Sequence, residues 1–267
     1  MAQKTKEFKV LRVYTSDFFI KSFINEYLIL LIMKSLLDSV KKELMPVPNK
    51  ALVTKIVKTL ENSIKSQKFK AEVFIGGSYA KKTFIRNDFD VDIFIRFKDS
   101  RNLSAKLEKI LKNSKLKYKR VHGSRDYFQI KNKINFEIVP VKKIKNYREL
   151  ENVTDASPLH VNFVIQKLKK NKSLADEIRL TKQFCKSIKV YGAESYRQGF
   201  SGHVIDLLII YYGSFQRLIK AASKWEPKVV IDIKKHHKNP LFELGRSKTH
   251  SPLVIVDPIQ PYRNAAA

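Results

Sequence analysis

The strongest constraint on the fold is a short run in which an apolar strand ends in two glycines and the next strand opens with two carboxylates. Residues 73–75 are apolar and lead into Gly76 and Gly77, and Asp90 and Asp92 stand one residue apart at the start of a second apolar stretch. Side chains alternate between the two faces of a strand, so both aspartates emerge on one face while their neighbours enter the core. The run predicts a sheet that carries paired carboxylates beside a tight backbone turn.

Two carboxylates held side by side repel each other, so their placement calls for a cation. Mg²⁺ prefers oxygen ligands and substrate phosphates, and two metal ions can activate the attacking oxygen and stabilise the leaving one in a nucleotidyl transfer. A third carboxylate usually completes such a site, and Glu137 in the predicted strand 134–141 is the candidate. Its two neighbours are apolar and must face the other way, and a lone carboxylate at a strand centre is costly unless it is paired. We therefore expect Asp90, Asp92 and Glu137 to be catalytic, metal-binding residues.

The glycine turn is the second ingredient of this candidate site. Gly76 and Gly77 let the backbone approach a ligand closely, and Ser78 adds a hydroxyl at a predicted helix start, where free amides favour phosphate. Each signal is weak alone, since two glycines suit an ordinary turn equally well and paired aspartates are common. Their combination in one compact run, followed by a carboxylate-bearing strand, favours a nucleotidyltransferase site.

The apolar pattern divides the chain near residue 145 into a strand-rich half and a helix-rich half. Before it, we expect helices at 34–44, 49–66, 79–84 and 101–113 and strands at 73–75, 89–97, 116–121, 125–131 and 134–141. After it, we expect helices from residue 157, at 173–190, at 203–212 and after 214, and strands at 228–233 and 253–257. The expected fold class is α+β, with a mixed or antiparallel sheet and helices in residues 34–145 and a mainly helical domain in residues 146–267.

The charge balance indicates a polyanionic partner. The chain has 53 Lys and Arg residues against 25 Asp and Glu residues, a formal charge of +28. Such an excess favours a nucleic acid, because each bound phosphate releases condensed counterions. A Lys-rich coding bias is the alternative explanation. Cys185 is the one cysteine, which excludes internal disulfides, argues against cysteine-based zinc sites and fits a reducing cytoplasm.

The N-terminal segment allows more than one interpretation. Residues 18–37 are largely apolar, but several polar residues interrupt them, whereas a membrane span needs about 20 predominantly apolar residues. No small-residue cleavage site follows, which argues against a signal peptide. We therefore expect no membrane association. Residues 1–33 are either an added helix or an upstream misreading with Met33 as the true start.

Six stretches of the chain carry a resemblance to a known family. In chain order they are GGSYAKKTFIRNDFDVDIFIRF, NFEIVPV, DASPLHVNFV, DEIRLTKQFCKSIKVYGAE, GFSGHVIDLLIIYYGSF and VDPIQPYRN. Through the first of them the chain resembles the polymerase-beta-like nucleotidyltransferases. Through all six it resembles one group closely, the archaeal, class I CCA-adding enzymes, which are tRNA nucleotidyltransferases. The match is specific because five stretches lie outside the paired-aspartate run.

The resemblance implies roles for the matched residues of the first half. Asp90, Asp92 and Glu137 fall on the metal-binding carboxylates, of which the third is commonly aspartate, so that Glu137 is a departure that keeps the charge. Ser78 and Lys81 fall in the phosphate-binding turn.

In the second half, the resemblance implies that His160, Lys182 and Tyr191 hold the triphosphate and ribose of the incoming nucleotide and that Arg263 helps to read its base. Lys182 also shares a helical stripe with apolar residues, which predicts an inward position, although a lysine that extends to solvent is the alternative. Without the resemblance, His160 could equally be a satisfied, partly buried histidine, Tyr191 a core residue and Arg263 a surface residue.

The resemblance implies a Mg²⁺-dependent enzyme that transfers CMP and AMP from CTP and ATP to the 3′ acceptor end of tRNA. Two alternatives stay open: a poly(A)-type or oligoadenylate-type polymerase on the same fold, and a noncatalytic RNA-binding relative. Family members continue past the VDPIQPYRN stretch into domains that grip the tRNA. We therefore expect a fragment, a reduced form, or one half of a split enzyme whose partner is a separate tail-bearing chain.

Overall fold

The computed structural model describes residues 31–194 and 197–267, and the chain divides into two compact units, residues 1–43 and 44–267. In the first unit, residues 31–43 are helical. The predicted extension 1–33 therefore lies outside the described residues apart from its last three. Among the helices in the described ranges, none combines the length and apolar character that crossing a membrane requires.

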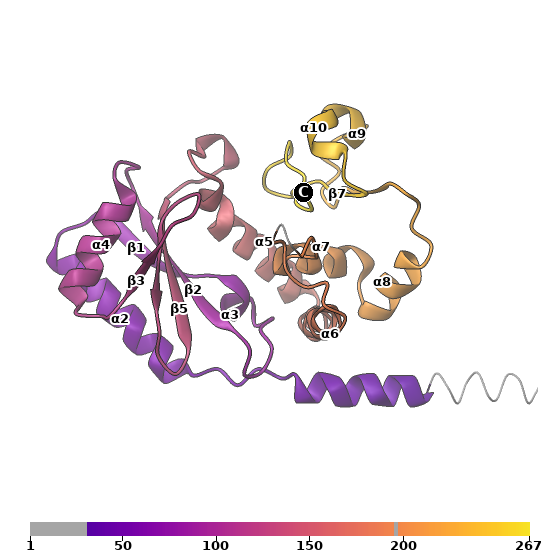
Figure 1. The fold of residues 1–267 in the computed structure, drawn as a ribbon, viewed down its shortest axis with the longest axis horizontal. Helices are drawn as coiled ribbons and strands as arrows, with labels where there is room; N and C mark the ends of the chain where they lie inside the picture. The colour runs from indigo at the N-terminus through magenta and orange to yellow at the C-terminus, as the bar shows by residue number, and fades with distance from the viewer. Residues whose placement is uncertain (1–30, 195–196) are drawn as a thin grey trace, which may run out of the picture. The chain divides into compact units, whose positions relative to one another are not determined.

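A five-stranded sheet lies in the first part of the second unit (Figure 1). Its order is β1-β2-β5-β4-β3, and its strands are β1 Ala71–Ile75, β2 Asp90–Phe97, β3 Lys119–Val121, β4 Tyr127–Ile130 and β5 Asn135–Lys142. β2 and β5 pair in parallel, whereas the other neighbours pair antiparallel. A parallel pair needs a long connection, which α4 and the hairpin β3–β4 supply here. The expectation of a mixed sheet is confirmed.

Two helices, α2 (Lys50–Ser66) and α4 (Leu103–Ser114), cover one face of this sheet (Figure 1). Asn49 begins α2 by accepting a hydrogen bond from the amide of Leu52 at 3.2 Å. Val53, Ile56 and Leu60 follow at helical spacing and are buried in the core beneath the sheet. These two helices leave the opposite face of β2 and β5 uncovered, so the side chains on that face do not belong to this core.

A second apolar core is mainly helical and joins four helices with a two-stranded parallel sheet. Its elements are α5 Ser157–Lys170, α6 Leu174–Ser187, α7 Gly202–Tyr212, α8 Phe215–Ala222, β6 Val229–Ile231 and β7 Leu253–Ile255. Ser201 caps the start of α7, and Gly213 ends it in the left-handed conformation at φ 85°. The α+β class is thus confirmed. The short elements that remain are η1 Tyr147–Glu149, η2 Val153–Ala156, α9 Pro240–Glu243 and α10 Arg246–Thr249.

Several predicted boundaries were wrong, and the helix after the glycine turn matters most. It was expected at 79–84, but α3 spans Gly77–Lys81 because Lys82 adopts the left-handed conformation at φ 58° and ends it. Thr83 and Phe84 are then buried in the connection that leads back to β2. The predicted strand 116–121 shortens to β3, and the helix expected to reach 190 ends at Ser187.

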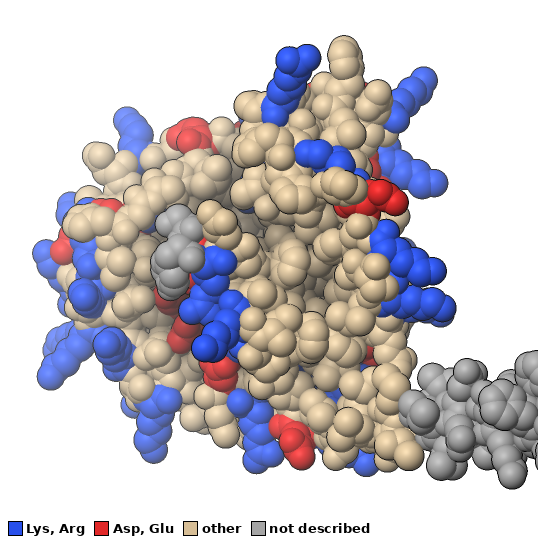
Figure 2. Space-filling model, turned by 45° about the vertical axis from the view of Figure 1, so that its right-hand side comes forward, with Lys and Arg blue, Asp and Glu red and all other residues tan. Residues whose placement is uncertain are grey.

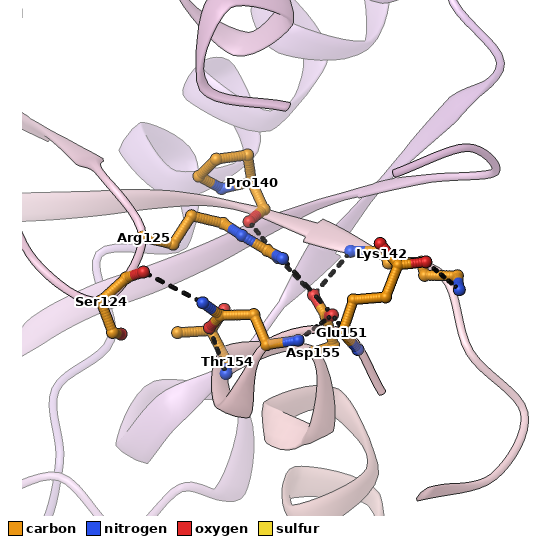
Figure 3. A network of polar contacts seen from close by, with 8 residues as sticks. Ser124, Arg125, Pro140, Lys142, Glu151, Thr154 and Asp155 are labelled. Carbon is orange, nitrogen blue, oxygen red and sulfur yellow. Dashed lines mark hydrogen bonds and ion pairs between the residues drawn. The ribbon is translucent and has the colours of Figure 1, made fainter. Parts of the chain in front are cut away.

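A buried carboxylate joins the end of the sheet to the chain before α5 (Figure 3). Asp155 is fully buried and ion-paired with Arg125. Its oxygens also accept hydrogen bonds from the amides of Lys142 at 2.8 Å, Asn152 at 3.0 Å and Glu151 at 3.3 Å. One side chain therefore satisfies a guanidinium and three backbone donors.

We expect Asp155→Ala to lower the free energy of unfolding by about 3–5 kcal/mol, because it leaves Arg125 without its counter-charge and three amides without an acceptor. Urea titration followed by circular dichroism measures this loss. Asp99→Ala is the control, because it removes the exposed ion pair with Lys106 and should leave the unfolding midpoint nearly unchanged. Equal midpoints for Asp155→Ala and the unmodified protein would contradict the prediction.

Candidate active site

Asp92 and Glu137 lie directly opposite each other on the two parallel strands. The register pairs Asp92 of β2 with Glu137 of β5, and residues paired in this way point to the same face of the sheet. Asp90 precedes Asp92 by two residues, shares its face and is exposed. Val91 and Ile93 are fully buried in the core under α2 and α4. The three predicted carboxylates thus emerge together on the opposite face, as the strand alternation predicted.

Asp92 is a buried carboxylate that lies next to a second carboxylate, that of Glu137. Burial, followed by the charge of Glu137, raises the pKa of Asp92 to about 6, although the nearby Lys81 opposes the shift. Gln129 on β4 donates a hydrogen bond from Nε2 to Oε1 of Glu137 at 3.1 Å, which orients that carboxylate. A cation bound among these oxygens would relieve the repulsion, so the donor set fits a hard divalent ion.

The glycine turn presses against the carboxylate strand. A Cβ atom on Gly77 would lie 1.5 Å from Oδ2 of Asp92, and Gly77 has φ +55°. A Cβ atom on Gly76 would lie 2.2 Å from the ring of Phe94, and its amide donates a hydrogen bond to the carbonyl of Asp92 at 2.8 Å. Ser78 follows as the second residue of α3. Any larger residue at either position would force a neighbouring side chain to move, so both positions favour glycine for steric reasons, whatever ligand the turn holds.

Two lysines from different elements meet at one buried carboxylate, that of Asp206 in α7. Lys81 of α3 places Nζ 2.5 Å from Oδ2 of Asp206, and Lys182 of α6 places Nζ 3.5 Å from Oδ1. Lys182 also donates hydrogen bonds to the carbonyl and hydroxyl of Thr83, both at 3.2 Å. Lys182 is 3% exposed, so its predicted inward position is confirmed and the solvent-directed alternative is wrong.

Burial has the expected effect on these groups. It lowers the pKa of Lys182 to about 8, with the charge of Asp206 limiting the shift. Burial by itself raises the pKa of the Asp206 carboxyl, but Lys182 and Lys81 hold that pKa below its usual range. Burial also raises the pKa of Tyr191 to about 12. The Tyr191 hydroxyl and Nζ of Lys182 both lie near Gly202, because a Cβ atom there would be 3.0 Å from the hydroxyl and 3.8 Å from Nζ.

His160 and Arg263 converge on a second buried carboxylate, Asp257. Nε2 of His160 lies 2.7 and 2.9 Å from the two oxygens, and Nη1 of Arg263 donates to Oδ2 at 2.6 Å. Oδ1 also accepts from the amides of Ile259 and Gln260. Burial raises the pKa of Asp257, but the hydrogen bond and charge of His160, together with the two amides, hold it well below its usual range. Both residues are thus oriented by one carboxylate.

His203, at the start of α7, completes this cluster. Its ring lies 4.6 Å from that of His160, and burial lowers its pKa to about 3. Within the described part of the chain, one set of three side chains has potential metal-ligand atoms that all lie within 4.8 Å of one another: His160, His203 and Asp257. The predicted carboxylate trio is not that set. Because Asp257 already accepts several hydrogen bonds and pairs with Arg263, we interpret the set as an orienting cluster.

The residues that sequence reasoning missed are Asp206, Asp257 and His203. Asp206 lies in α7, where its neighbours on both sides are apolar. A carboxylate inside an otherwise apolar helix was itself the available signal, because such a group is rarely buried without a cation. Asp257 carried no comparable signal, since its partners come from residues up to 97 positions away.

Two protein families match the chain in sequence. The model described as "Nucleotidyltransferase domain" matches residues 55–185, and the one described as "tRNA nucleotidyltransferase, second domain" matches residues 176–267. A CCA-adding enzyme of Nanoarchaeum equitans is 45% identical over 204 residues, which are 73% of this chain and 50% of that protein. A CCA-adding enzyme of Sulfurisphaera tokodaii is 37% identical over 199 residues, or 72% of this chain and 46% of that protein. The chain spans about half the length of these relatives.

Solved structures with low sequence identity share the fold. The Cid1 poly(U) polymerase with Mg and 3′-dATP bound superposes with a TM-score of 0.69 at 14% identity, over 88% of this chain and 87% of that one. CdnC of E. coli MS115-1 with ATP gives a TM-score of 0.63 at 18% identity, over 85% and 82%. Together with the sequence matches, the paired carboxylates beside the glycine turn identify the chain as a member of the tRNA nucleotidyltransferase family, and the relatives that it resembles in sequence are CCA-adding enzymes.

Proposed function

We propose that the chain is the nucleotide-transferring part of a CCA-adding enzyme, which completes or repairs the 3′ end of tRNA with CMP and AMP from CTP and ATP. In this reaction the terminal 3′ hydroxyl of the RNA attacks the α-phosphate of the nucleotide, and pyrophosphate leaves. The observation that carries the proposal is that three carboxylates share one sheet face while the glycine turn packs directly against one of them. The sequence relatives named CCA-adding enzymes support the choice of substrate.

Asp90, Asp92 and Glu137 are proposed to hold Mg²⁺ and to act as the catalytic carboxylates. Burial and the charge of Glu137 raise the pKa of Asp92, and both effects support a cation at this position. Bound there, two metal ions would favour ionisation of the attacking hydroxyl and neutralise charge on the leaving oxygen. The carboxylates themselves fix where the reacting phosphate sits relative to the sheet.

The remaining proposed site residues, Ser78, Lys81, His160, Lys182, Tyr191 and Arg263, bind the nucleotide. The ammonium groups of Lys81 and Lys182 and the imidazole of His160 would bind the triphosphate and stabilise charge as pyrophosphate departs. Ser78 would donate its hydroxyl to phosphate, and Tyr191 would contact the ribose. Arg263 uses Nη1 for Asp257 and is 39% exposed in its side chain, so its other donors are free to face a base.

RNA is the proposed macromolecular partner. The net charge of +28 supports a polyanion, and Lys and Arg side chains are spread over the face seen in Figure 2. The acceptor end of tRNA would reach the carboxylates, and a separate chain that supplies the remaining length of the relatives is a further proposed partner. A cytoplasmic location follows from a tRNA substrate.

A poly(A)-type polymerase is the second candidate, supported only by the fold shared with RNA-extending polymerases.

We expect the chain to add CMP to tRNA that lacks CCA and AMP only after two C residues, without extension beyond the final A. Gel analysis of tRNA incubated with CTP, ATP or both measures this. Long A tracts formed without CTP would favour the polymerase. Absence of incorporation, even with a tail-bearing partner, would favour a noncatalytic RNA-binding protein.

Asp92→Asn should abolish CMP incorporation while tRNA binding stays nearly unchanged. Loss of metal binding removes roughly 4 kcal/mol of transition-state stabilisation, which corresponds to about 1000-fold in rate. RNA affinity depends mainly on phosphate contacts of Lys and Arg. Radiolabelled CMP transfer and filter binding of tRNA measure the two effects. If a folded Asp92→Asn protein loses RNA binding in parallel with activity, the assignment is wrong.

Gly77→Ala should reduce incorporation at least tenfold, because the new Cβ displaces Asp92 and the left-handed backbone adds about 1–2 kcal/mol of strain. Gly123→Ala is the matched control, since its Cβ meets no atom closer than 3.4 Å. Initial rates of CMP transfer for both variants measure the effect, with circular dichroism to confirm folding. Equal rates for the two variants would show that the turn does not position Asp92.

A further inference from the structure

We propose that Asp206 is a positioning residue that holds the ammonium groups of Lys81 and Lys182 together so that one triphosphate can meet both. This inference rests on the proposed function, because it deepens the role of the two lysines. Asp206 itself need not touch the nucleotide. It would act through the cations on either side of its carboxylate.

Three elements from distant parts of the chain converge on this carboxylate. Lys81 lies on α3 directly after the glycine turn, Lys182 lies in the middle of α6, and Asp206 lies in α7. Their side chains are 9%, 4% and 0% exposed, respectively. Two cations this close repel each other when little water screens them. The carboxylate between them is what permits both to stay charged and close together.

The two carboxylate oxygens of Asp206 differ in their hydrogen bonding, and this difference favours a positioning role over a simple structural ion pair. Oδ2 pairs with Lys81 at 2.5 Å, whereas Oδ1 is buried and has no hydrogen-bond donor among the described residues, with Lys182 at 3.5 Å. Lys182 instead donates to Thr83. An unsatisfied buried oxygen costs stability, so its presence calls for an explanation. A carboxylate that must leave the second lysine available for phosphate provides one.

An apolar residue would suit α7 better if Asp206 served stability alone. Its neighbours Ile205, Leu207 and Leu208 are all buried in the helical core. Buried ion pairs often contribute less to stability than well-packed apolar side chains of similar volume. The charge balance gives the functional reason, since two lysines against one carboxylate leave a net positive charge for an anion.

The pH at which Lys182 loses its proton can test the inference, because a merely structural role of Asp206 would not change that pH. Burial lowers its pKa to about 8, Asp206 raises it, and Lys81 and Lys186 lower it. Burial raises the pKa of Tyr191 to about 12 and lowers that of His203 to about 3, so both neighbours stay neutral between pH 6 and pH 9. The pKa of Asp92, which interacts with Lys81, is raised to about 6, so this carboxyl ionises at the lower end of that range in every variant. Lys182 is charged below its pKa, so removal of Asp206 should discharge it at a lower pH. Removal of Lys81 should discharge it at a higher pH.

The test is the dissociation constant for CTP between pH 6 and pH 9.5, measured by calorimetry on the unmodified chain and on Asp206→Asn. We expect binding by the unmodified chain to weaken as the pH rises through about 8. In Asp206→Asn the weakening should begin about one pH unit lower. At pH 6, where Lys182 remains charged in both proteins, the difference in CTP affinity between them should be smallest. Weakening by the same factor at every pH, or an unchanged profile, would overturn the inference.

Asp155→Asn is the matched control, because it also removes a fully buried carboxylate from an ion pair but lies away from the two lysines. It should lower stability and leave the pH profile of CTP binding unchanged. Lys81→Met provides a second variant in case Asp206→Asn does not fold, and it should move the loss of binding to higher pH. A profile that Lys81→Met leaves in place would also overturn the inference. Absence of CTP binding by the unmodified chain would instead contradict the proposed function.

Discussion

The parallel pairing of β2 with β5 is the interaction on which the candidate site depends. It sets Asp92 opposite Glu137 and turns both toward the face that α2 and α4 leave uncovered. The apolar residues between the carboxylates are fully buried on the other face, so a slip of one residue in register would bury the charges. The same core that stabilises the sheet therefore fixes where the carboxylates emerge.

The second core contributes positive charge to the same region. α6 and α7 supply Lys182 and Asp206, and Asp206 meets Lys81 from the glycine turn. Farther along, Asp257 orients His160 and Arg263. Each buried carboxylate thus serves two basic side chains, which lets several cations lie close together without strong mutual repulsion. This arrangement matches a ligand with dense negative charge, such as a nucleoside triphosphate.

Much of this could be predicted from local patterns. Three patterns depend only on residues close in sequence: the alternation at Asp90 and Asp92, the glycine turn, and the apolar stripe around Lys182. The structure agrees with the prediction from each of them. Local reasoning failed at α3, where the left-handed Lys82 ended the helix early so that Thr83 could be buried. It also left His160 undecided, because its partner Asp257 lies 97 residues away.

The sequence alone determined the α+β class and the strand face that bears the carboxylates, and it favoured the inward direction of Lys182, because these follow from periodicity and from the cost of burying charge. Only the tertiary structure decided which groups meet. The contact of Asp206 with Lys81 joins residues 125 positions apart, and that of Asp257 with His160 joins residues 97 positions apart. No local spacing encodes such pairs, since they form only when the chain folds and brings these distant segments together.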